Sequence, residues 1–134
     1  MAFEGGQLTV VGALAGADLS TKLFHFVKKS ATNLQFTTPS VDGEIVIGVQ
    51  QNKPDAAGKT LTVAYIGVTK MECGENLTAG DFVGTDNAGK AKKIDVSATG
   101  ADVGDYIAGV VLEGASSGEL CTVLLIPGYR VFAS

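Results

Sequence analysis

The chain contains one strand–turn–strand pattern twice. Residues 105–128 have the sequence DYIAGVVLEGASSGELCTVLLIPG, and residues 44–67 have the sequence EIVIGVQQNKPDAAGKTLTVAYIG. Gly48 aligns with Gly109, 61 positions later, and Val63 aligns with Val123, 60 positions later. Short apolar runs bounded by Gly, Ser and Pro are typical of β-hairpins. The repeat therefore predicts two similar hairpins in one domain; a chance likeness between two segments rich in Gly and Val is the alternative interpretation.

Short apolar or alternating runs separated by turn residues continue through the rest of the chain. The further expected strands cover residues 8–11, 23–27, 34–38, 67–72, 82–83 and 91–96. The segment Asp86-Asn87-Ala88-Gly89 has the composition of a tight turn. No segment keeps a helical period over three turns. Turn signals that recur every 8 to 12 residues predict an all-β barrel or sandwich of about ten short strands.

The composition fits one folded domain with an incompletely covered apolar surface. The chain has 134 residues, of which 18 are Gly, 3 are Pro and 46% are hydrophobic, so many tight turns are a better explanation than disorder. Charged residues make up 18%, and the mean hydropathy is +0.27. Because large exposed apolar patches usually mark interfaces, this sparse charge indicates that a partner covers part of the surface.

Residues 1–20 are apolar but rich in Gly and Ala. Two interpretations stay open: a frayed terminus, or an extended N-terminal arm that is ordered only against another subunit. The arm is favoured because bare apolar residues on a soluble monomer promote aggregation. Residues 21–134 would then form a single β domain that contains both hairpins. The candidate contact residues of the arm are Phe3, Leu8, Val10, Val11 and Leu14.

Charge and motifs disfavour several function classes. Ten Lys and Arg against 14 Asp and Glu give a net charge of −4, and the basic residues form no stripe, so nucleic acid is not an expected partner. No signal peptide and no membrane span is expected. An intracellular origin favours free thiols at Cys73 and Cys121. With one histidine and no close ligand spacing or nucleophile motif, we expect no metal, no cofactor and no enzymatic activity.

Five short segments occur in an order that resembles the capsid decoration, or head cement, proteins of tailed phages. The resemblance covers about residues 44–128 and does not extend to residues 1–20. The segments are VTKMECG at 68–74, LTAGDFV at 77–83, TDNAGKA at 85–91, DYIAGV at 105–110 and GELCTVLLIPG at 118–128.

The resemblance implies a compact β-clip or β-tulip-like barrel on the outer surface of a virion, made in the cytoplasm of a bacterial host. Such a protein is a homotrimer or dimer that bridges subunits of the major capsid protein and stabilises the shell, often through its N-terminal arm. The alternative is a small β-clip module that binds a carbohydrate or other small ligand. Tyr65, Tyr106 and His25 are then the first candidates for the ligand pocket.

Overall fold

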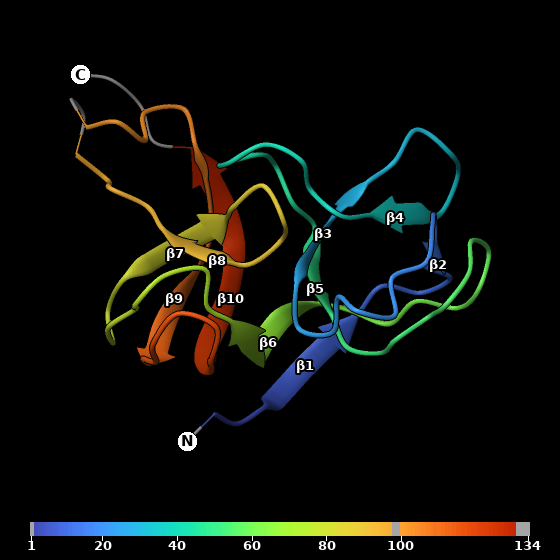
Figure 1. Ribbon diagram of the computed structural model, residues 1–134, viewed down its shortest axis with the longest axis horizontal. Helices are drawn as coiled ribbons and strands as arrows, with labels where there is room; N and C mark the ends of the chain where they lie inside the picture. Colours follow the sequence, from blue (N-terminus) through green and yellow to red (C-terminus); the bar gives the residue numbers. More distant parts are fainter. Residues whose placement is uncertain (1, 98–99, 131–134) are drawn as a thin grey trace.

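The computed structural model describes residues 2–97 and 100–130, and within these ranges it consists of strands and connecting loops (Figure 1). The predicted all-β class with about ten short strands is confirmed. The strands are β1 (Gly5–Thr9), β2 (Leu14–Ala15), β3 (Phe26–Lys29), β4 (Gln35–Thr37), β5 (Gly48–Gln50), β6 (Val63–Glu72), β7 (Phe82–Thr85), β8 (Ala91–Lys93), β9 (Tyr106–Glu113) and β10 (Leu120–Arg130).

All ten strands belong to one sheet. Their order is β2-β4-β3-β5-β6-β10-β9-β7-β8, and β1 pairs in addition with β6. The β2–β4 pair is parallel and the other pairs are antiparallel. In Figure 1, β7 to β10 form one group, β2 to β5 form another, and β6 joins them. In the described part of the chain the end strands β2 and β8 do not pair with each other, so the sheet stays open instead of closing into the barrel.

The two segments that share the repeated pattern form two antiparallel hairpins, β5–β6 and β9–β10. Residues that align in the sequence occupy the same positions in the two ladders, so the hairpins have the same register. The equivalent cross-strand pairs are Val49↔Ala64 with Val110↔Leu124, and Gln50↔Val63 with Val111↔Val123.

A glycine occupies the same position in both hairpins because the two backbones approach each other too closely for a side chain. A Cβ atom on Gly48 would lie 2.2 Å from the carbonyl oxygen of Ala64, and one on Gly109 would lie 2.8 Å from the carbonyl oxygen of Leu124. Both distances are shorter than any normal contact of a carbon atom, so each position requires glycine. The shared glycine of the repeat therefore has a packing origin.

Strand β6 is the hub of the sheet, because it pairs with β5, β10 and β1. The sequence predicted two strands here, one that completes the first hairpin before Gly67 and one that covers residues 67–72. The structure has one strand of 10 residues, in which Gly67 adopts a φ of +109° and still pairs with Leu125 of β10. A Cβ atom on Gly67 would lie 2.4 Å from the carbonyl oxygen of Gly6. Gly67 thus bends β6 and lets β1 pass close by, without ending the strand.

The buried side chains form one main core, a second core and a small third cluster. The main core packs Phe26 and Met71 with the inward residues of β7, β9 and β10. The second core includes Ala13, Ala15 and Leu19 of the predicted arm, so in the isolated chain this part of residues 1–20 lies against the domain. Contact between the arm and another subunit stays a prediction.

Candidate functional site

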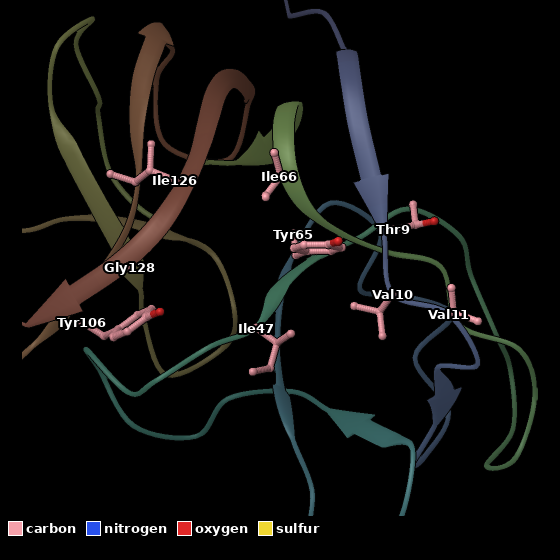
Figure 2. Close-up of a pocket in the computed structure, with 9 residues that line it drawn as sticks. All are labelled: Thr9, Val10, Val11, Ile47, Tyr65, Ile66, Tyr106, Ile126 and Gly128. Atoms are coloured by element: carbon pink, nitrogen blue, oxygen red, sulfur yellow. The ribbon is translucent and has the colours of Figure 1, made fainter.

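An open apolar hollow of about 580 Å³ lies where β6 and β10 diverge (Figure 2). None of its nine lining residues is charged, and the side-chain polar atoms among them are the hydroxyls of one threonine and two tyrosines. The lining residues are Thr9, Val10, Val11, Ile47, Tyr65, Ile66, Tyr106, Ile126 and Gly128. We refer to this set as the apolar hollow.

The apolar hollow follows from the course of β6. The ladder between β6 and β10 ends at Gly67↔Leu125. On the N-terminal side of this point β6 pairs instead with β5 and β1, while β10 continues along β9. Tyr65 and Ile66 lie at the point of divergence and are both exposed, at 39% and 38%. The strands separate here, and the space between them is bounded by side chains rather than by backbone pairing.

Two tyrosines shape the apolar hollow. Figure 2 shows Tyr65 and Ile47 between Tyr106 on one side and Val10 on the other. The ring of Tyr106 lies against Gly128, where a Cβ atom would be 2.1 Å from the ring carbon Cζ. The backbone N–H of Tyr106 donates to the carbonyl of Gly43 at 3.0 Å, which fixes the start of β9. Glycine at position 128 therefore makes room for the Tyr106 ring at the wall of the hollow.

A charged rim adjoins the apolar hollow. Ile47 also lines a neighbouring depression of about 490 Å³ together with Lys28, Lys29, Val41, Glu44 and Ile45. Lys28 and Glu44 form an ion pair with an N···O distance of 2.9 Å. Burial raises the pKa of Glu44, but hydrogen bonds from Lys28 and from two backbone N–H groups outweigh burial, and its pKa lies below the usual value. The carboxylate is therefore ionised at neutral pH, and the rim carries both signs of charge.

The structure brings two of the five predicted arm residues into the apolar hollow, Val10 and Val11. Val10 also packs against the second core, whereas Val11 is 93% exposed. Leu14 lies elsewhere, on β2, where it is half-buried and pairs with Gln35 of β4.

The remaining two arm residues lie at β1. Leu8 pairs with Ile66 of β6 and is 52% exposed. Phe3, which precedes β1, is 48% exposed, and its backbone N–H donates to the hydroxyl of Thr122 at 3.1 Å. Four of the five residues of β1 are exposed and the fifth, Gln7, is half-buried. Backbone pairing and a few polar contacts, rather than apolar packing, thus hold β1 in place.

Of the three residues predicted to line a small-ligand pocket, two come together. Tyr65 and Tyr106 both line the apolar hollow. His25 does not, because it is buried, with Nδ1 at 3.0 Å from the carbonyl oxygen of Leu23. Sequence reasoning missed Ile47, Ile66 and Ile126. The one local feature that could have indicated the hollow is the pair Tyr65-Ile66 before Gly67. This pair does not show which strands diverge there.

The described residues include no group of three or more His, Cys, Asp or Glu side chains placed to hold a metal ion. Within the same ranges no helix has the length and apolar character needed to cross a membrane. Cys73 and Cys121 are free, buried thiols. Burial raises the pKa of both, and burial together with the neighbouring Cys73 thiol raises the pKa of Cys121 to about 12.

Comparisons with known proteins point to the phage head. The N base of the head fibre protein gp8.5 of bacteriophage phi29 has a similar crystal structure, with a TM-score of 0.65 and 17% sequence identity over 90% of this chain and 93% of that chain. That likeness shows a shared fold. No curated protein sequence matches the chain. The family model described as phage cement protein matches residues 4–126, which include the first hairpin, the second hairpin as far as Ile126, and every residue of the apolar hollow except Gly128. The chain therefore belongs to the phage cement protein family.

Proposed function

We propose that the chain is a capsid decoration protein, which binds the outer surface of the phage head and bridges neighbouring subunits of the major capsid protein. A structural role in the phage head follows from the family. The finer proposal rests on β1 and the residues before it. They present Phe3 and Leu8 about half exposed, on a strand that has few buried contacts of its own.

A role of this kind needs no catalysis, and we propose that the protein is not an enzyme. It acts by occupying sites on the shell in fixed proportion to the capsid subunits. Each bridge raises the free energy that is needed to separate two subunits. We further propose that it binds as a homo-oligomer, a trimer or a dimer. Several copies tethered together bind a symmetric shell much more tightly than one copy does, without any strong single contact.

The runner-up, a small β-clip module that binds a carbohydrate or other small ligand, is less well supported by the apolar hollow. Tyr65 and Tyr106 are present as that function requires, but the side-chain polar groups of the lining are three hydroxyls. Sites for small polar ligands combine an apolar lining with several convergent polar groups. An uncharged, open and mostly aliphatic hollow is better suited to protein side chains.

The proposal is tested with phage heads that lack this protein. The purified chain is mixed with such heads, sedimented and imaged, and we expect saturable binding at regular positions on the outer surface. The double variant Phe3→Ser with Leu8→Ser should bind at least about tenfold more weakly, because it loses two apolar contacts of the interface. The matched control Val96→Ser with Val103→Ser alters two other exposed apolar residues and should bind as the unmodified protein does. Equal binding by both double variants would contradict the role of β1.

A further inference from the structure

One residue that lines the apolar hollow, Val11, also projects from its edge (Figure 2). Val11 is the most exposed of the large apolar side chains that the structure describes, at 93%. It lies in a turn with Gly12, which has a φ of +78°. In Figure 2, Val10 points into the hollow while Val11 lies at its edge. One surface of the chain therefore carries both a hollow and a projecting side chain.

A second turn, at Leu34, lies next to this projection. Leu34 is 53% exposed and has a φ of +63°, a left-handed conformation that costs a leucine about 1 kcal/mol. Its Cδ1 atom would lie 4.0 Å from a Cβ atom on Gly12, and its carbonyl accepts a hydrogen bond from the N–H of Leu14 at 2.8 Å. The turns at Val11 and Leu34 thus form one apolar projection, which we call the apolar knob.

We propose that the apolar hollow is the surface through which the protein associates with itself, and that it receives the apolar knob of a second copy of this chain. The inference deepens the proposed function and rests on it only for the expectation that the protein is an oligomer. The uncharged lining selects an apolar occupant, because a charged group placed there would lose its hydration without gaining a partner.

The adjacency of knob and hollow favours a second copy over another protein. When a projection and a hollow lie on one chain, a rotation that brings each knob into the hollow of a neighbour satisfies every copy equally, and the assembly is closed when that rotation returns to the first copy. The rim is also suited to self-contact, because the ion pair between Lys28 and Glu44 within each chain neutralises much of its charge and leaves little repulsion between copies. An apolar centre within a polar rim is the usual anatomy of a protein interface.

Solubility favours the same occupant. Because a bare apolar patch promotes non-specific association, covering it keeps the protein soluble. Self-association through the apolar hollow also leaves the Phe3 side chain free for the capsid. Phe3 does not line the hollow, and its backbone N–H donates to the hydroxyl of Thr122 on β10.

The test is the mass of the full-length protein in solution, measured by analytical ultracentrifugation over a wide range of concentration. The unmodified chain should form one defined oligomer. Val11→Asp should raise its dissociation constant at least about a hundredfold, because a carboxylate would enter an uncharged hollow. Val96→Asp makes the same change at another exposed valine and should leave the mass unchanged. Val11→Ile, which keeps the apolar contact, should also preserve the oligomer.

A monomeric unmodified chain at every concentration would overturn the inference, and so would an unchanged mass for Val11→Asp. Ile66→Asp places a carboxylate inside the hollow itself and should weaken the oligomer as Val11→Asp does. Urea unfolding shows whether each variant is folded. Head binding, measured on the same samples, separates the two proposals. If the unmodified protein is a monomer that still binds heads, the inference is overturned and the proposed function stands. If the unmodified protein is an oligomer that Val11→Asp disrupts, but that oligomer binds no head, the inference stands and the proposed function is overturned.

Discussion

At the scale of single residues, glycines decide where the backbones of this sheet can meet. Replacing Gly48 or Gly109 with Ala would place a Cβ atom 2.2 or 2.8 Å from a carbonyl oxygen of the paired strand. We expect each substitution to lower the free energy of unfolding by about 1 to 3 kcal/mol, since the strands must move apart. Urea unfolding measures the loss. Gly5→Ala is the control, because a Cβ atom at Gly5 meets nothing within 4 Å, and its effect should stay within about 0.5 kcal/mol.

The two cysteines give a second prediction at this scale. Cys73 and Cys121 are 0% and 1% exposed, and burial raises the pKa of both thiols. Because the thiolate is the reactive form, neither should react appreciably with an alkylating reagent near pH 8 in the folded protein. Both should react promptly in denaturant. Mass spectrometry counts the added groups, and rapid modification of the native protein would show that the core opens or that the thiols are accessible.

At the scale of secondary-structure elements, the sequence predicted the hairpins well. The runs around Gly48 and Gly109 are short, apolar and bounded by turn residues, and local chemistry alone sets such elements. It missed β2, which has two residues and exists only because β4 lies beside it. It also split β6 at Gly67, because a positive φ that ends most strands is here compensated by pairing on both sides. Contacts between distant segments therefore account for what local patterns could not show.

An ion-pair cluster ties the loop before β9 to strand β8. Nζ of Lys92 lies 2.9 Å from a carboxylate oxygen of Asp102 and 3.5 Å from one of Asp105. The N–H of Asp95 donates to Asp102 at 2.6 Å. Burial raises the pKa of Asp102, but the bonds from Asp95 and Lys92 outweigh burial, so the pKa lies below its ordinary value of 3.8. The folded protein therefore stabilises the ionised form of Asp102 more than the unfolded chain does.

The sign of this shift fixes a pH dependence. A carboxyl group with a lowered pKa contributes stability that is fully present above its ordinary pKa and is lost as the pH falls through the folded value. We expect the free energy of unfolding to decrease between about pH 5 and pH 2. Asp102→Asn should lose roughly 1 kcal/mol at neutral pH and show a smaller further loss in acid. An unchanged acid dependence in that variant would show that Asp102 does not contribute to it.

At the scale of the whole molecule, the amino-acid composition predicted an exposed apolar surface but could not show where it lies. A charged content of 18% and a mean hydropathy of +0.27 predicted that a partner covers part of the surface, which stays a prediction. The structure places the predicted arm residues Val10 and Val11 in the apolar hollow. The apolar hollow itself arises where β6 leaves β10, and its lining comes from segments as far apart as Thr9 and Gly128. No local pattern brings such residues together, so this part of the site required the fold.

The molecule as a whole then presents two apolar surfaces with different proposed partners. The residues at β1 are proposed to face the capsid, and the apolar hollow is proposed to face a second copy. This division explains how one small chain could both assemble and attach, because assembly through the hollow presents several β1 strands to a symmetric shell at once.

The most direct test of this account is the binding of the purified chain to heads that lack it, followed by co-sedimentation and imaging. We expect saturable occupancy of symmetry-related positions on the outer surface, and heads that withstand heat or chemical stress better once the protein is bound. A folded protein that binds no such head at any concentration, and that leaves the stability of the heads unchanged, would contradict it.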